Sequence, residues 1–454
     1  MPLKSSLGNR ATLRMSLFCL TLVSTASACV ESIGLPADSS TGLRYPIALV
    51  ADPSGTRIFA LGANYDRLFR AGRMRLIDTS NDTFVVDAAG AAVTAEVPSF
   101  GGSFAMDVVK GATAPLHLIV PARDDDSVSV LDVRDATATT LDCSANALTG
   151  ICADDHRIAG HDGLFPVGDD PIAVALSDSP DGRRRIHVAA ANNGFLTLLD
   201  YDPKEQPLNL RTLDQVTLPA GLNSIVVSPL SQRAYVTTTA TAAVQTYRVD
   251  PGPSTDKPWV IAQEPAVVLP SSAIVDYGRG LVFSSDYSRL YVAWRSPASL
   301  AILDVVPDGT GVPSNRLVDT IVLGSKPSGL AVAPLGPGGR DLVYVSCYAD
   351  DAIWVVDPAL RTTVARIPMR LGVQETGSDP QIVRGSPFAM VAVNVPDHRH
   401  VPPLANEPPP GWRLYAGLFS VPPGADHHVV VIPIDPAAAN RYVPDHIVHV
   451  GGAK

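Results

Sequence analysis

Residues 339–357 read GRDLVYVSCYADDAIWVVD, in which two short apolar runs flank the turn Ala349-Asp350-Asp351. Both runs are rich in Val, Ile and Tyr and end at polar residues, a pattern typical of two β-strands joined by a hairpin. The same pattern returns along most of the chain. A repeat architecture is therefore the first hypothesis for the fold.

Seven copies of this pattern follow one another at intervals of roughly 50 to 67 residues. In each copy an apolar run ends near Pro or Ser, a polar turn leads to a Tyr-Val type run, and two further runs follow. The copies begin with PIALVADP (46–53), FAMDVVKG (104–111), PIAVALSDSP (171–180), LNSIVVSP (222–229), RGLVFSSD (279–286), PSGLAVAP (327–334) and SPFAMVAV (386–393).

Four strands in each of seven copies predict an all-β fold, a seven-bladed β-propeller of four-stranded antiparallel blades over residues 43–452. Insertions in copies two and three leave six or eight blades as alternatives. In copy two we expect the fourth run at TATTLD (137–142). The chain starts on a first strand and ends on a fourth, so we expect the terminal blades to meet edge to edge.

The segment DTIVLGSKPSGLAVAP (319–334), with LVYVSCYADDAIWVVD (342–357), resembles the YVTN repeats of bacterial and archaeal surface-layer-type propellers. The resemblance extends in phase over nearly the whole region after residue 42, although individual copies are degenerate. It implies the fold and leaves the function open, because this architecture serves lactonases, redox-enzyme subunits and binding scaffolds alike.

The first 28 residues are typical of a signal peptide, with Lys4, Arg10 and Arg14 ahead of the apolar run MSLFCLTLVSTASA (15–28). Ala26-Ser27-Ala28-Cys29 resembles a bacterial lipobox, which implies lipidation of Cys29 and a tether over residues 29–42. Ala26 departs from the preferred Leu, and the same letters fit a signal peptidase site. We therefore predict an exported lipoprotein of the bacterial cell envelope, with a secreted or periplasmic protein as the alternative.

Export changes the interpretation of the cysteines, because disulfides persist in oxidising compartments. Cys143 and Cys152 are close enough in sequence to close a small loop, and we predict a disulfide between them. Cys347 lies within a predicted strand and is expected to be a buried free thiol. The sequence has no CxxCH haem-attachment motif and no CxxC pair.

The formal net charge of −10 and the absence of a basic run argue against nucleic acid as a partner. The acidic residues that end the third run of each copy recur with the repeat, and we interpret them as turn caps. They are Asp78, Asp132, Asp200, Asp304, Asp357 and Asp435.

The acidic turns between second and third runs project onto one propeller face, and the insertion 144–170 joins them there. Carboxylates converging over a channel mouth would suit Ca²⁺, although no turn has the spacing of a complete calcium loop, so a solvated acidic rim is the alternative. No cofactor is expected. The candidate residues of this binding face are Asp124, Asp125, Asp126, Asp154, Asp155, His156, His161, Asp350, Asp351, His427 and His428.

Six histidines crowd the last copy, but the repeat divides them among two faces and a rim strand, which argues against one metal site. They are His398, His400, His427, His428, His446 and His449. Nucleophile-elbow, phosphate-loop and HExxH motifs are missing from the sequence. We therefore expect no catalytic residue and no turnover.

The function predicted from the sequence is a non-catalytic binding or scaffold module at the cell envelope. It would bind an envelope protein or surface ligand through one propeller face, touch the membrane by its lipid anchor alone, and act as a monomer. A periplasmic enzyme of lactonase or quinoprotein type, with a metal or cofactor at the central channel, is the alternative. A subunit that docks on a redox partner is a third hypothesis.

Overall fold

The structure of the chain is a computed structural model. It describes residues 43–65, 68–69, 71–87, 90, 92–98, 101–108, 115–133, 141–146, 151–159, 166–205, 208–255, 257–273, 275–336, 339–376, 379–397, 411–420, 429–435 and 448–450. The predicted signal peptide, Cys29 and the predicted tether lie outside these residues.

Seven antiparallel sheets follow one another along the chain, each built from consecutive strands. Blades one to three are β1 (Pro46–Ala51), β2 (Arg57–Gly62), β3 (Ala71–Asp78), β4 (Thr83–Phe84) and β5 (Thr94–Pro98); β6 (Ala105–Val108), β7 (Pro115–Ala122), β8 (Ser127–Asp132) and β9 (Arg157–Ala159); β10 (Pro171–Asp178), β11 (Arg184–Ala190), β12 (Phe195–Tyr201) and β13 (Arg211–Thr217).

Blades four to seven continue the same order. They are β14 (Leu222–Val227), β15 (Ala234–Thr238), β16 (Ala243–Pro251) and β17 (Trp259–Val268); β18 (Gly278–Phe283), β19 (Arg289–Arg295), β20 (Ala298–Asp304) and β21 (Arg316–Val322); β22 (Pro327–Gly336), β23 (Arg340–Cys347), β24 (Ala352–Asp357) and β25 (Thr362–Pro368); β28 (Ser386–Val395), β29 (Gly411–Ser420), β30 (Val429–Pro433) and β31 (Val448–His449).

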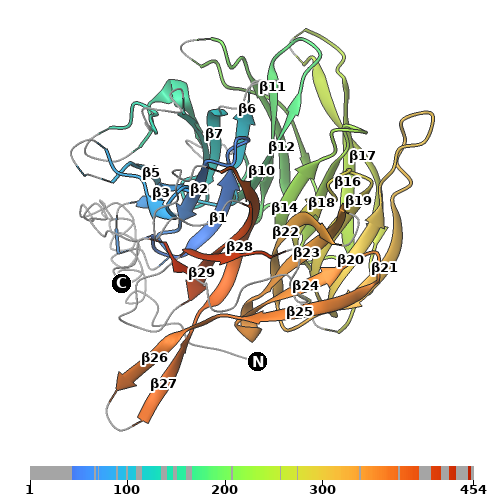
Figure 1. Cartoon of the computed structure of the whole chain (residues 1–454). Helices are drawn as coiled ribbons and strands as arrows, with labels where there is room; N and C mark the ends of the chain where they lie inside the picture. The colour runs from blue at the N-terminus through green and yellow to red at the C-terminus, as the bar shows by residue number, and fades with distance from the viewer. Residues whose placement is uncertain are drawn as a thin grey trace, which may run out of the picture.

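The blades are arranged around a central axis, with the first strand of each blade innermost (Figure 1). Each sheet is ordered first, second, third and fourth strand, and only blade one has a fifth strand, β5, which pairs with β3. The predicted seven-bladed propeller of mostly four-stranded blades is confirmed.

The hydrophobic core lies between neighbouring blades. One buried cluster joins Ile353 and Val355 of blade six to Leu414 and Ile432 of blade seven. Successive side chains of a strand point to opposite faces of the sheet, so a blade with two apolar faces must be covered on both sides. Stacking around a ring gives every blade two neighbours, which explains why the hairpin recurs.

Two details differ from the expectations. The fourth strand of blade two is β9, beyond the disulfide, and not residues 137–142; Asp142 instead forms an isolated bridge with Asp132. The terminal blades pack face to face, because the apolar faces of blades one and seven share a buried cluster that includes Ile58 and Tyr415. Arg413 Nη1 adds an ion pair to Asp82 at 2.9 Å across this closure.

Turns sort onto two faces of the ring. The face that carries the second-to-third strand turns and the starts of the first strands is called the mouth face below. The face with the third-to-fourth strand turns is called the capped face. A two-stranded hairpin, β26 (Arg370–Thr376) with β27 (Asp379–Arg384), follows blade six and projects away from the ring (Figure 1).

Candidate functional site

A cavity of about 370 Å³ lies at the axis on the mouth face. All seven blades contribute to its lining, so it is a property of the closed ring and of no single repeat. The lining residues are Ile47, Ala63, Tyr65, Gly101, Gly102, Ser103, Arg123, Ile172, Asn223, Ser224, Arg279, Gly280, Ser328, Gly329, Phe388, Ala389 and Phe419. This cavity is called the mouth.

Irregular pairing at the start of the first strands explains how these side chains come to the axis. In six blades the register shifts at this point, for example between Leu222 and Ser224 or between Pro327 and Leu330. The residue that the shift skips is left out of the ladder, as in a β-bulge. Asn223 and Ser328 are two such residues, and both line the mouth.

Glycines allow the inner strands to approach closely here. A Cβ atom on Gly102 would lie 1.9 Å from the carbonyl oxygen of Ile172 in the next blade. One on Gly329 would lie 2.1 Å from the carbonyl oxygen of Phe388. Any side chain at these two positions would therefore push neighbouring blades apart.

Two arginines are the charged residues of the mouth lining, as far as the chain is described. Arg123 follows β7 and pairs with Asp170 through two hydrogen bonds, from Nε at 2.5 Å and from Nη2 at 2.7 Å. Arg279, at the start of β18, donates from Nη2 to Asp276 at 2.6 Å. Asp276 also accepts a hydrogen bond from Arg295, whose Nη1 lies 3.2 Å away.

Asp276 thus serves two guanidinium groups. Burial lowers the pKa of Arg279, and the nearby guanidinium of Arg295 lowers it further, with Arg123 acting in the same direction. The buried Nε of Arg279 has no hydrogen-bond partner among the described residues. Buried polar groups are usually paired, so this donor marks a place where a further acceptor would be favourable.

The opposite side of the mouth is aromatic. Tyr65, Phe388 and Phe419 line it, and the ring centroid of Phe419 lies 5.4 Å from those of both others. Tyr45 and Tyr348 extend the cluster, with centroids 5.4 Å and 6.1 Å from Phe419. Blades one, six and seven therefore supply an aromatic wall, while blades two and five supply the two arginines.

The central channel continues beneath the mouth as a second cavity of about 710 Å³. The two cavities share Ser103 and Ser224 in their linings. The channel is lined by the first strands of the blades, and it has no charged residue among those described.

Some of the acidic residues predicted for the binding face do lie together. Asp124, Asp125 and Asp126 form the turn between β7 and β8, and Asp126 accepts the backbone N–H of Asp170 at 2.8 Å. Asp125 pairs with Arg157 at 2.5 Å. Burial raises the pKa of Asp126, and the neighbouring carboxylates raise it too. These side chains hold the insertion against blade two and do not line the mouth.

Asp154, Asp155 and His156 form the short 3₁₀ turn η1 (Asp154–His156). The buried His156 lies with Nδ1 2.8 Å from an oxygen of Asp155 and with Nε2 3.8 Å from Asp132. The fully buried His117 approaches the same carboxylate of Asp132 at 3.0 Å. This group fastens the insertion to blade two.

Asp350 and Asp351 have partners of their own in blades six and seven. Trp354 Nε1 donates to Asp350 at 3.2 Å, and Ser386 Oγ donates to Asp351 at 2.8 Å. His161, His427 and His428 lie outside the described residues, as do His398, His400 and His446. Within the described ranges no three His, Cys, Asp or Glu side chains are grouped to hold a metal ion.

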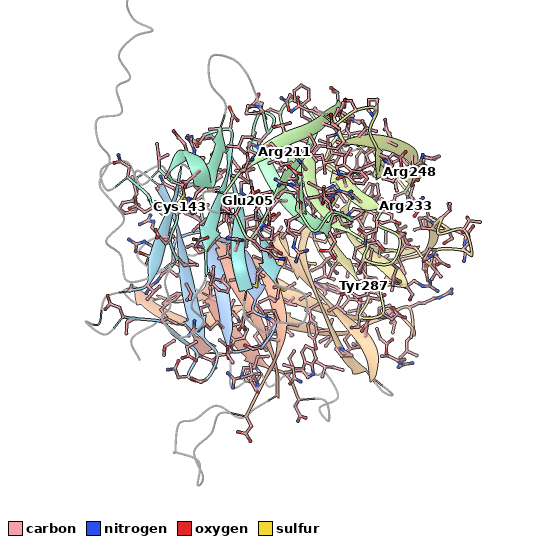
Figure 2. All side chains as sticks on the ribbon, turned by 90° about the horizontal axis from the view of Figure 1, so that it is seen from above. Cys143, Glu205, Arg211, Arg233, Arg248 and Tyr287 are labelled. Carbon is pink, nitrogen blue, oxygen red and sulfur yellow. A yellow bond between two sulfur atoms is a disulfide. The ribbon has the colours of Figure 1, made fainter. Side chains whose placement is uncertain are left out.

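The cysteines behave as predicted. Cys143 and Cys152 form a disulfide, and Cys143 is seen in Figure 2 beside the first blades of the ring. Cys347 is a buried free thiol in β23, and burial raises its pKa to about 12. A search of the described residues for a helix of sufficient length and hydropathy to cross a membrane finds none.

Sequence reasoning missed the mouth residues, because it weighed acidic turns and histidines only. A usable signal was present in the three residues that open the seven first strands: PIA, GGS, PIA, LNS, GRG, PSG and PFA. The middle residue takes six identities in the seven copies, while the first and third residues are Pro, Gly, Ala or Ser in nearly every copy. Such a position is free of the demands of the repeat, and in this ring it points to the site.

No protein-family model and no curated protein matches the sequence. Solved structures do match. A functionally unknown protein from Desulfotomaculum acetoxidans shares 12% identity over 84% of this chain and 92% of its own, with a TM-score of 0.50. The periplasmic gluconolactonase of Pseudomonas aeruginosa (18% identity, 75% and 89% covered, TM-score 0.48) and hydrazine synthase of Kuenenia stuttgartiensis (15%, 87% and 99%, 0.48) also match. The similarity to the Desulfotomaculum protein is one of fold.

Proposed function

We propose that the chain is an exported, lipid-anchored binding module of the cell envelope, which takes its ligand at the mouth. The observation that carries the proposal is a cavity at the axis to which every blade contributes. Sites of this kind gather residues that are remote in sequence and hold them on a rigid scaffold.

The chemistry of the lining supports binding over turnover. Its polar groups, within the described residues, are guanidinium, hydroxyl, amide and backbone groups. A general base must be unprotonated near neutral pH to accept a proton from the substrate, and Arg remains protonated there. The nearest carboxylates, Asp170 and Asp276, are held in ion pairs with the arginines.

Binding at the mouth can be tested with a variant that fills it. Asn223→Trp places a large ring in the lining, and Leu230→Trp adds the same ring to the exposed turn after β14, at the other end of the same blade. Ligand-observed NMR with neutral, anionic and cationic fragments should show binding to the wild type and to Leu230→Trp, and loss in Asn223→Trp. Equal binding by all three proteins would contradict the proposal.

The same samples separate a binding module from the enzyme alternative. Fragments recovered after incubation should be chemically unchanged by mass spectrometry. Hydrolysis of a sugar lactone or phosphoester by the wild type, abolished by EDTA, would favour a periplasmic lactonase-type enzyme in place of the binding module.

Anchoring is tested at Cys29. Cys29→Ser should move the protein from the membrane fraction to the soluble fraction, because lipoprotein anchors with several acyl chains hold almost completely. Cys19→Ser, within the signal peptide, is the matched control and should leave the fractionation unchanged. An unmodified mature terminus by mass spectrometry would leave secretion as the explanation.

A further inference from the structure

The mouth combines two kinds of surface that rarely serve the same ligand atom. One side presents Arg123 and Arg279, and the other presents Tyr65, Phe388 and Phe419. Beneath them the channel is lined by the first strands and has no charged residue among those described. Resting on the proposed function of the mouth as a binding site, we propose that its ligand is an amphiphilic anion, a carboxylate or phosphate ester carried on an apolar body.

The charge count on the arginine side favours an anion. Arg123 is matched by Asp170, whereas Arg279 and Arg295 share Asp276. Asp276 therefore carries one negative charge between two guanidinium groups, so an anionic group bound beside Arg279 would be attracted by both. Both Arg279 and Arg295 are sheltered from solvent, with 23% and 11% of their side-chain surface exposed, so water screens this charge incompletely.

The carboxylates Asp125, Asp126 and Asp169 of this face do not line the mouth. Asp125 pairs with Arg157, Asp126 accepts the N–H of Asp170, and Asp169 accepts Asn192 Nδ2 at 3.0 Å. They lie with the turn of blade two and the insertion, whereas Arg279 is in blade five.

Donor geometry points to the same place. Arg295 uses Nε, Nη1 and Nη2 on Pro327, Asp276 and Ser328, so it is committed to the protein. Arg279 uses Nη2, while its buried Nε has no partner among the described residues. Nη1 of Arg279 also has no hydrogen bond among the described residues, and Arg279 lines the cavity, so an oxyanion at the mouth would be received there.

The rest of the ligand must be apolar. A hydrophilic anion would leave its hydroxyl groups against the aromatic wall, where buried polar groups without partners are costly. The channel adjoins the mouth through Ser103 and Ser224. A chain or ring attached to the anionic group would enter it and bury apolar surface, the dominant favourable term in such binding.

Calorimetry with five probes tests the proposal on the wild-type protein. Octanoate and octyl phosphate carry both required parts, octanol lacks the charge, and gluconate and inorganic phosphate lack the apolar chain. Octanoate or octyl phosphate should bind about tenfold or more tightly than the other three. The tighter of the two assigns the headgroup as carboxylate or phosphate. Octanol binding as tightly as both would overturn the proposal, as would equal binding of gluconate.

Variants locate the anion. Arg279→Met should weaken the octanoate or octyl phosphate complex about tenfold or more and leave octanol unchanged, while Arg279→Lys keeps the charge and should be intermediate. Arg316→Met is the matched control, because Arg316 is in the same blade, pairs with Asp304 and is 68% exposed; it should bind as wild type. Wild-type affinity in Arg279→Met, with binding abolished in Asn223→Trp, would overturn the anion site and leave the mouth as a binding site.

The two proposals fail differently. If no fragment class responds to Asn223→Trp, the mouth is not a binding site and the proposed function fails. If neutral fragments bind at the mouth as well as anionic ones, only the ligand class is wrong. Should Arg279→Met fold poorly, the comparison of charged and neutral probes on the wild type still decides.

Discussion

The two faces of the ring both place two arginines on one carboxylate, but with opposite consequences. On the capped face, Arg183 and Arg211 share Asp200, and Arg233 and Arg248 share Glu264; Arg211, Arg233 and Arg248 are labelled in Figure 2. In each pair one arginine, Arg211 or Arg248, has 45% of its side chain in solvent. Water therefore compensates the extra charge.

On the mouth face, both arginines on Asp276 are sheltered, and one lines a cavity. The same stoichiometry is compensated by water where solvent reaches it and is not where solvent does not. If the proposed binding site is correct, exposure, and not the number of ion pairs, separates a ligand-binding arginine from a structural one in this ring.

The faces differ in periodicity as well. Carboxylates recur on the capped face and are satisfied there: Asp357 accepts the N–H groups of Ala359 and Leu360 at 3.0 Å, and Asp304 accepts that of Val306. The interpretation of these residues as turn caps is confirmed for both. Arg123 and Arg279 of the mouth have no counterparts in neighbouring copies.

Removing Asp200 should produce the largest effect on the capped face. Its side chain is 2% exposed and accepts from both arginines, so Asp200→Ala leaves the largely buried Arg183 with only the more distant Glu205, at 3.9 Å, as an acidic partner. We expect the free energy of unfolding to fall by about 3 kcal/mol in urea titrations. The control Asp202→Ala, in the turn of the same blade, should cost less than about 1 kcal/mol. Octanoate affinity unchanged in Asp200→Ala would sharpen the contrast between faces, and a large loss would break it.

The disulfide of the mouth-face insertion comes next. Replacing Cys143 and Cys152 with Ala releases a loop with a sequence separation of 9. The chain-entropy estimate for such a loop is on the order of 2 to 3 kcal/mol. Urea titration measures the loss, and Cys347→Ala provides the comparison for a cysteine outside the insertion. A denatured, non-reduced mature protein that titrates three thiols instead of one would show the pairing to be absent.

The third prediction concerns His187, which is buried between the two faces of the ring. It is buried between Ser177 and Tyr247, and burial, aided by Arg185, lowers its pKa to about 3. An unfolded histidine has a pKa near 6.5, so below that pH the unfolded chain takes up a proton that the folded protein refuses until about pH 3. Folding stability contributed by neutral His187 is complete above pH 6.5 and is lost as the pH falls.

The loss should approach about 1.4 kcal/mol per pH unit between roughly pH 6 and pH 4. His187→Gln keeps polar groups for both neighbours and cannot be protonated, so the difference in unfolding free energy between the two proteins should carry this slope. Parallel curves for wild type and variant over this interval would rule His187 out as the source.

The smallest effect is expected on the aromatic wall. Phe388→Ala removes ring contacts with Phe419 and Tyr348 at the mouth. We expect octanoate binding to weaken by about 1 kcal/mol, roughly fivefold, with little change in the unfolding midpoint. Tyr287→Ala, on the exposed ring at the capped end of the channel and labelled in Figure 2, should bind as wild type. A larger loss for Tyr287→Ala than for Phe388→Ala would place the ligand at the wrong end.

The sequence by itself determined the repeat, the strand order in nearly every blade, the disulfide and the buried thiol. These follow from local rules, because alternating apolar runs and turn residues act over a few positions and each copy states them again. Local rules failed where the chain departs from the repeat. The fourth strand of blade two is β9 and not residues 137–142. It follows a disulfide-closed loop that the other copies lack, so the spacing of the repeat does not predict it.

The site was decided by tertiary structure alone. Arg123 and Arg279 are separated by more than two blades of sequence, and only ring closure brings both to one cavity. Their ion pairs also depend on residues further along the chain: Arg123 pairs with Asp170, and Asp276 is divided between Arg279 and Arg295. Burial and charge balance are sums over side chains that meet in space, and no pattern within one copy of a repeat records them.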